Sequence, residues 1–153
     1  MSHAAQKTIV AHVPIADFYA TIVDYHAYPQ ITDEVKSVRT VSRDGDVAVV
    51  AYTARIMLKS FEYTLRMDER PDEHRMSWTL VSSSTLTINR GSWRLEALSA
   101  DRTRVHYENE LGARIWVPNS FITALSGVVL PKMLRRWAEY AEAQVRRGEA
   151  RVA

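Results

Sequence analysis

Apolar and polar residues alternate without a break in the stretch Phe61-Glu62-Tyr63-Thr64-Leu65-Arg66-Met67-Asp68. Successive side chains of a β-strand point to opposite faces of the sheet, so a period of two residues is typical of a strand. The aromatic and aliphatic residues of this stretch would share one face, and the charged and hydroxyl residues would share the other. A strand with one apolar face is typical of an antiparallel sheet that is packed on one side only.

The same period of two continues on both sides of this stretch. We expect strands at residues 35–43, 47–58, 61–68, 74–81, 88–98 and 104–111. Short polar turns separate these strands, and one of them, Asp44-Gly45-Asp46, is typical of a hairpin. Six consecutive strands with short connections predict an antiparallel meander, and its apolar face must be covered by another layer.

The residues before the meander predict one more strand and a short helix. Residues 7–13 are rich in β-branched side chains and predict a strand. Residues 14–23 place apolar side chains at helical spacing after a proline that suits the first turn of a helix. Residues 25–31 predict a loop or a broken second helix, because Pro29 restricts Tyr28 to extended geometry.

The covering layer is predicted at the end of the chain. Residues 118–144 form the longest helical pattern, and Pro131 should bend this helix because it removes a backbone hydrogen bond. The apolar stripe consists of Phe121, Ile122, Leu125, Val128, Val129, Met133, Trp137 and Tyr140. The whole pattern, β-α-α-β6-α, predicts an α+β fold in which a curved antiparallel sheet of about seven strands wraps around the last helix.

Length and composition narrow the class of protein. The 153 residues predict a single domain, 1–153, with a core of about 7–144 and a basic tail at 145–153. The absence of cysteine excludes disulfides, thiolate metal sites and a cysteine nucleophile. The five histidines show no ligand spacing, and no phosphate-binding or dinucleotide motif is present, so we expect no metal and no cofactor. Without a signal peptide or an apolar run of roughly 20 residues, we expect a cytoplasmic protein.

Four features of the sequence together resemble a known superfamily. They are the proline-started helix at 14–24, Tyr28-Pro29 after it, Gly91-Ser92-Trp93-Arg94-Leu95, and the closing stretch from Val117-Pro118 through Leu130-Pro131 to Trp137 and Tyr140. The chain resembles the START-like (SRPBCC) superfamily with the helix-grip fold, most of all its branch of Coq10-like proteins and polyketide cyclases/dehydrases. The resemblance covers about residues 7–144 and implies a deep apolar tunnel between sheet and helix.

Alternation within the strands and the helical stripe indicate which side chains would line such a cavity. The expected lining consists of Tyr52, Ile56, Tyr63, Leu65, Trp78, Trp93, Tyr107, Asn109, Phe121, Leu125, Val129 and Met133. His26 and Tyr28 are candidates for the cavity mouth. For each of these residues, ordinary core packing or an exposed loop position is the alternative. Asn109 lies on the apolar face of its strand and needs a partner, either a ligand or a neighbouring hydroxyl or water.

Three functions are compatible with this pattern. The first is binding, transport or sensing of a hydrophobic small molecule, for which the resemblance implies a quinone, a lipid or a polyketide-like molecule. The second is a polyketide aromatase/cyclase, for which the resemblance implies a cavity arginine and tyrosines that polarise a carbonyl of the substrate. A bulge at Gly91 would turn Asn89 or Arg90 inward, and Arg90 and Tyr107 are the candidates for this role. The third, implied by relatives that act as toxins, is interaction with the ribosome.

The charge pattern bears on the partners of the chain. Residues 132–153 hold six basic and three acidic side chains, which favours a solvated helix end, with brief contact with an anionic membrane surface as the alternative. We expect no DNA partner. RNA or ribosome contact is disfavoured because aromatic side chains suited to base stacking do not interleave with the basic residues. The pattern leaves the oligomeric state open.

Overall fold

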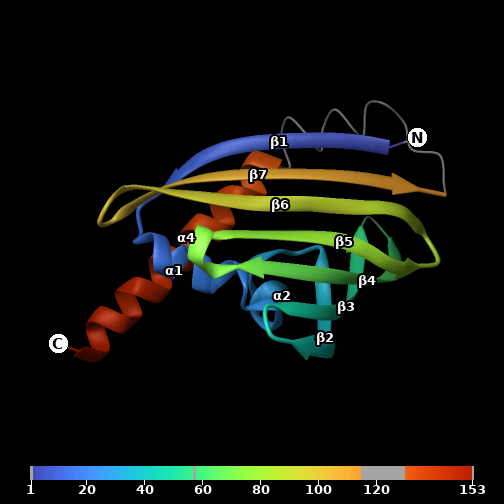
Figure 1. Ribbon diagram of the computed structural model, residues 1–153, viewed down its shortest axis with the longest axis horizontal. Helices are drawn as coiled ribbons and strands as arrows, with labels where there is room; N and C mark the ends of the chain where they lie inside the picture. Colours follow the sequence, from blue (N-terminus) through green and yellow to red (C-terminus); the bar gives the residue numbers. More distant parts are fainter. Residues whose placement is uncertain (1, 57, 115–129, 153) are drawn as a thin grey trace.

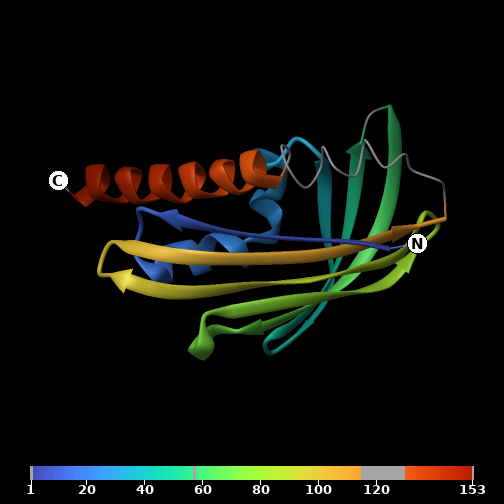
Figure 2. The same cartoon turned by 90° about the horizontal axis from the view of Figure 1, so that it is seen from above.

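The computed structural model describes residues 2–56, 58–114 and 130–152. Seven strands form one antiparallel sheet in the order β1-β7-β6-β5-β4-β3-β2. The strands are β1 (Ser2–Ala11), β2 (Val35–Asp44), β3 (Val47–Ile56), β4 (Lys59–Arg70), β5 (Arg75–Ser83), β6 (Leu86–Ser99) and β7 (Arg102–Ala113). Figure 2 shows β2, β3 and β4 turned up toward the side on which α4 lies, so the sheet is strongly curved. The predicted α+β helix-grip architecture and meander are confirmed.

Helices cover one face of this sheet. They are α1 (Ile15–Ile22), η1 (Tyr25–Ala27), α2 (Tyr28–Ile31) and α4 (Leu130–Val152), and a further short helical turn, η2 (Pro71–Glu73), joins β4 to β5. In Figure 1, α1 and α4 lie behind the strands β5, β6 and β7. None of the helices within the described residues is long and apolar enough to cross a membrane.

The first strand is longer than the sequence pattern predicts. It begins at Ser2 instead of residue 7 and pairs with β7 in an unbroken register from Ser2 opposite Gly112 to Ala11 opposite Thr103. The prediction was too short because residues 2–6 are polar and small and carry no alternating pattern. Backbone pairing with a neighbouring strand does not require that pattern, so tertiary context decides the strand's start.

The prediction for Tyr28 was wrong. Its backbone is helical, with φ −52° and ψ −41°, although a proline follows it. Packing overrides the local preference, because the Tyr28 ring is buried and lies 4.8 Å from the ring of Trp137 on α4. The Tyr28 hydroxyl also donates a hydrogen bond of 2.6 Å to the Ile22 carbonyl. The segment 25–31 is therefore two short helical turns.

The C-terminal helix differs from its prediction at its far end. It continues to Val152 instead of ending near residue 144, so the predicted basic tail is helical. Arginine and alanine are strong helix formers, and a single glycine, Gly148, is too weak a breaker to end the helix. The described part of α4 starts at Leu130, so its predicted beginning at 118 lies outside the described residues. Pro131 is the second residue of the described helix, and the turn before it, which the expected bend would involve, is not described.

Candidate functional site

The inner face of the sheet, which is the face toward the helices, falls into two parts with different packing. The first part lies under α1 and α4 and is filled by side chains, and we call it the packed half. Phe18 of α1 contacts the Trp93 indole at a ring distance of 5.9 Å, and Trp137 of α4 contacts the same indole at 5.2 Å. The buried residues around them are Val13, Ile22, Met76, Leu95, Val105 and Leu134. This half is ordinary close-packed core.

The second part continues along the same face toward the opposite ends of the strands. We call it the open half and define it by Tyr63, Leu80, Tyr107 and Asn109. All four side chains are only half-buried. They lie on three strands: Tyr63 on β4, Leu80 on β5, and Tyr107 and Asn109 on β7. Alternation within each strand turns them to the inner face. The open half is the candidate ligand-binding surface.

Stacked aromatic rings join the two halves. Tyr52 lies 5.9 Å from Tyr28 and 5.3 Å from Tyr63, in stacked geometry on both sides. Tyr107 lies 4.7 Å from Trp93 of the packed half. These rings provide a rigid apolar wall, because Tyr52, Tyr63 and Tyr107 each contact two other aromatic rings.

The tyrosine hydroxyls of the open half remain protonated at neutral pH. Burial, and to a smaller extent the charge of Glu34, raise the pKa of Tyr63 to about 12. Burial and the nearby Tyr63 raise the pKa of Tyr107, although a hydrogen bond from the Asn109 side chain opposes the shift. A protonated hydroxyl can donate a hydrogen bond, so both tyrosines can orient a bound oxygen atom.

Two asparagines point into the inner face, and their hydrogen bonding differs. Asn89 is 7% exposed, and its Oδ1 accepts a hydrogen bond of 3.0 Å from the Trp78 indole nitrogen. The Oδ1 atom of Asn109 is also buried, but it has no hydrogen-bond partner among the described residues. The hydrogen bond from Asn109 lowers the pKa of Tyr107, which is the effect of a donor, so the amide N–H group of Asn109 donates to the Tyr107 hydroxyl. The group of Asn109 that has no partner is therefore its acceptor, Oδ1. The open half therefore offers an unused buried acceptor beside a tyrosine hydroxyl.

Arg90 does not face the cavity. The pairing of β6 with β7 is regular from Ile88 to Ala97, and its irregularities lie outside that stretch, so the bulge expected at Gly91 is not found. Regular alternation turns Arg90 to the outer face, where it forms an ion pair of 2.5 Å with Glu110. A Cβ at position 91 would overlap the Trp78 indole and the Glu108 carbonyl, so glycine is required there by close packing.

The inward residue is Asn89, in place of which the sequence analysis preferred Arg90. Counting back by twos from the inward Trp93 through Gly91 would have identified it. Leu80 is absent from the predicted lining. Its half-exposed position next to Leu65 in the β4–β5 register places it in the open half.

The structure places the remaining predicted site residues as follows. Tyr28 belongs to the packed core instead of the mouth, and His26 is exposed, with its Nε2 2.9 Å from Thr40 Oγ1 on β2. Leu65, Tyr52, Trp78 and Trp93 are buried, and Met133 is half-buried against the core. Phe121, Leu125, Val129 and the Ile56 side chain lie outside the described residues. The cavity wall that they were predicted to form is therefore not described.

A family model matches residues 11–138 of this chain, and its description is polyketide cyclase / dehydrase and lipid transport. The chain belongs to this family. The match spans the sheet from the end of β1 through α4, so it includes both halves of the inner face. None of the curated proteins matches the chain. Among the described residues, no group of three or more histidine, aspartate or glutamate side chains is placed to hold a metal.

Several solved structures share the fold of this chain. A START superfamily protein from Mycobacterium smegmatis is 19% identical with a TM-score of 0.81, covering 93% of this chain and 99% of that one. The Zhui aromatase/cyclase from Streptomyces sp. R1128 is 17% identical with a TM-score of 0.80, covering 95% and 96%. The di-domain aromatase/cyclase BexL is 20% identical with a TM-score of 0.71, covering 92% of this chain and 46% of that one. Nothing in these similarities distinguishes a Coq10-like branch.

Proposed function

We propose that this chain binds a largely apolar small molecule on the open half of its inner face, as a carrier or sensor. The observation that supports this most is the buried Oδ1 of Asn109, which has no partner among the described residues. An unpaired buried acceptor costs about 1–3 kcal/mol, so a ligand that supplies a donor recovers that cost. The half-exposed rings of Tyr63 and Tyr107 supply apolar area around it.

The chemistry of the open half indicates what the ligand should carry. A flat aromatic or fused-ring body fits beside the stacked tyrosines and contributes about 25 cal/mol for each Å² of apolar surface buried. A hydroxyl at its inner end would donate to Asn109 Oδ1, and a carbonyl oxygen would accept from Tyr63 or Tyr107. A quinol, a phenol or a hydroxylated polyketide meets both conditions, which narrows the lipid or quinone ligand expected from the sequence.

A matched pair of probes tests this proposal. 2-Naphthol and 2-methoxynaphthalene have the same fused rings, but only the first carries a hydroxyl donor. In a fluorescence titration, we expect 2-naphthol to bind at least about fivefold more tightly, since one hydrogen bond to a buried acceptor is worth 1 kcal/mol or more. Asn109→Leu should abolish this preference, whereas Arg66→Gln on the outer face should leave it unchanged. If neither probe binds saturably, and native mass spectrometry of fresh protein finds no bound small molecule, the proposal is wrong.

The second candidate function is a polyketide aromatase/cyclase. It is favoured by the Tyr63 and Tyr107 hydroxyls, which stay protonated and can polarise a carbonyl of a poly-ketone. The arginine expected from the sequence does not support this function, because Arg90 is on the outer face. In a reconstituted cyclisation assay, Tyr107→Phe should lower the yield of the correctly cyclised product. Unchanged product with Tyr107→Phe and with Tyr63→Phe would exclude this function.

The membrane and ribosome contacts suggested by the basic end of α4 remain proposals. Arg136, one of its cations, forms an ion pair of 2.6 Å with Asp33 at the end of α2, so its charge is partly neutralised within the chain. Sedimentation with anionic vesicles and with ribosomes, repeated after Arg146→Gln and Arg147→Gln, tests both contacts. Sedimentation that these substitutions do not alter would remove the basic end of α4 from any such contact.

A further inference from the structure

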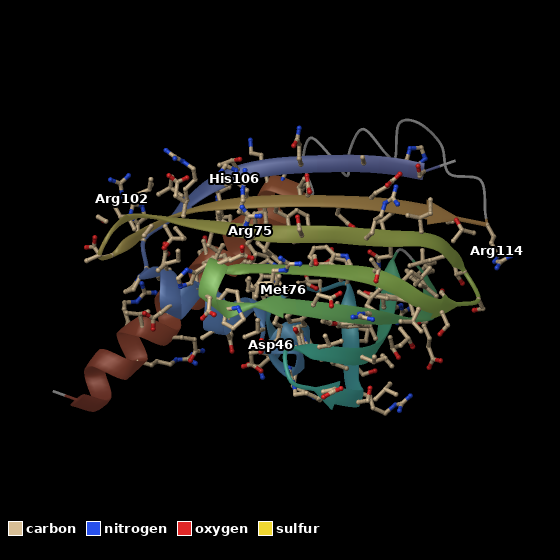
Figure 3. All side chains as sticks on the ribbon, viewed as in Figure 1. Asp46, Arg75, Met76, Arg102, His106 and Arg114 are labelled. Carbon is tan, nitrogen blue, oxygen red and sulfur yellow. The ribbon has the colours of Figure 1, made fainter. Side chains whose placement is uncertain are left out.

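A second concave site lies on the outer face of the sheet, opposite the helices. It is a groove of about 900 Å³ that crosses five strands, β1, β7, β6, β5 and β4. Figure 3 shows Arg75 and His106 on this face, above the strands that bound the groove. Apart from Tyr107, whose side chain turns to the inner face, no residue that defines the open half lines this groove.

Strand register places a row of three arginines and one histidine across the groove floor. Arg70 lies opposite Arg75, Arg75 opposite Arg94, Arg94 opposite His106, and His106 opposite Thr8. Residues directly opposite in an antiparallel pair have Cβ atoms about 4.5–5.5 Å apart, so these side chains are immediate neighbours. Three arginines and a histidine are thus aligned in one transverse row.

The two central arginines have no acidic partner. Arg70 forms an ion pair of 3.4 Å with Glu73, but no carboxylate among the described residues lies within ion-pair distance of Arg75 or Arg94. Like charges placed directly opposite in a sheet destabilise it. Other outer-face arginines avoid this cost; Arg104, for example, pairs with Glu96 at 3.2 Å. An uncompensated arginine pair in a groove is therefore a feature that folding does not explain.

Hydroxyl groups lie beside these arginines in the next row. Ser77 and Ser92 are directly opposite each other, and each is two residues from an arginine on the same strand. The carboxylates that flank them are engaged elsewhere: Asp68 pairs with Arg66 at 3.2 Å, and Glu108 accepts a hydrogen bond of 3.1 Å from the Ser92 hydroxyl. Because the Ser92 hydroxyl donates to Glu108, the centre of the groove combines two guanidinium groups with one remaining hydroxyl donor, that of Ser77.

His106 extends this set of donors. Its Nδ1 lies 2.8 Å from Thr8 Oγ1, which leaves Nε2 without a partner among the described residues. Guanidinium groups form bidentate hydrogen bonds with tetrahedral oxyanions, and hydroxyl and imidazole N–H groups can bind the remaining oxygen atoms. The cluster matches the donor set that a phosphoryl group requires.

We propose that this outer groove binds the phosphoryl group of a soluble small molecule, held between Arg75 and Arg94. The groove volume of about 900 Å³ suits a small molecule of nucleotide size. A membrane is the less favoured source of the phosphate, because the basic end of α4, which would also seek an anionic surface, lies on the opposite side of the sheet. The site is independent of the ligand proposed for the inner face.

Titration with inorganic phosphate and with pyrophosphate, observed through the ¹⁵N-labelled arginine Nε–H signals, tests the proposal. At 150 mM sodium chloride, we expect the Arg75 and Arg94 signals to shift saturably, with a dissociation constant in the millimolar range or below. Arg75→Gln and Arg94→Gln should each weaken binding at least tenfold, since a charge-assisted hydrogen bond contributes about 1.5–3 kcal/mol. The matched control, Arg104→Gln on the same face, should change it less than twofold.

These variants should fold, because both side chains are exposed and their removal relieves like-charge repulsion. Thermal unfolding checks this, and added phosphate should raise the Tm of the wild type but not of the doubly substituted protein. Shifts that do not saturate, or equal weakening by Arg104→Gln, would overturn the proposal. A second result would also overturn it: the protein sediments with vesicles of phosphatidylcholine and phosphatidic acid in a way that depends on Arg75 and Arg94, while neither phosphate nor pyrophosphate binds. This face would then be a membrane contact.

Discussion

Replacing each of the two inward asparagines by leucine should change stability in opposite directions. Asn89 satisfies the indole N–H of Trp78, and both groups are buried. Asn89→Leu leaves that N–H unpaired, so we expect a loss of about 1–3 kcal/mol in the free energy of unfolding. Asn109→Leu instead removes a buried oxygen that has no partner among the described residues.

The expected size of the Asn109 effect follows from two opposing contributions. Removing an unpaired acceptor should recover about 1–3 kcal/mol, while losing the amide contact to the Tyr107 hydroxyl should cost about 1 kcal/mol. The net change is a gain of roughly 0–2 kcal/mol, so the two variants should differ by about 3 kcal/mol. For a chain of this size, 1 kcal/mol corresponds to a shift in Tm of about 2–4 °C.

Urea unfolding of the ligand-free protein is the appropriate assay. We expect the unfolding midpoint to move down for Asn89→Leu and to stay or move up for Asn109→Leu, with unchanged m-values. Addition of 2-naphthol should stabilise the wild type and Asn89→Leu more than Asn109→Leu. If Asn109→Leu loses as much stability as Asn89→Leu, then the Asn109 oxygen already has a partner within the folded chain, and the reasoning that links it to a ligand fails.

Three further perturbations follow from the packing and charges described above. Gly91→Ala should lower the free energy of unfolding in urea by about 3 kcal/mol or more, because a Cβ there overlaps buried neighbours. Gly148→Ala meets open space on α4 and should instead stabilise the protein by about 0.5–1 kcal/mol. Equal effects of the two substitutions would refute the packing argument. Tyr63 titrates near 10 when unfolded and at about 12 when folded, so its contribution to stability is complete below pH 10 and is lost as the pH rises to 12; stability measured across this range should decline less in Tyr63→Phe. Arg136→Gln should lower stability by no more than about 1 kcal/mol, because both it and Asp33 are exposed, and the loss should vanish in 1 M salt; a larger, salt-independent loss would mean that the pair is structural.

Periodicity was sufficient to predict the sheet, because residues such as Tyr63, Leu65 and Met67 must share one face whatever their neighbours are. It also identified the inward position of Asn109. It could not predict the start of β1, since backbone pairing alone extends that strand through polar residues. It failed for Tyr28 because contact with Trp137, a residue more than 100 positions away, overrides the conformational preference before a proline.

The site was predicted less completely than the fold. The sequence placed the aromatic residues on the correct face, but it could not separate Trp93, which is enclosed by Phe18 and Trp137, from Tyr107, which is half-exposed on the same face. That difference depends on which side chains of the sheet α1 and the described part of α4 contact. The Arg75–Arg94 pair was missed for a related reason: the two residues lie on different strands, and only the register brings them together.

The division of the inner face has a consequence for how this chain can evolve. Folding depends mainly on the fully enclosed residues around Trp93, whereas the half-exposed side chains at Tyr63, Leu80 and Tyr107 contribute less to it. Substitutions among the latter can therefore accumulate without unfolding the protein. Natural selection can change what such a chain recognises while the scaffold beneath α1 and α4 stays the same.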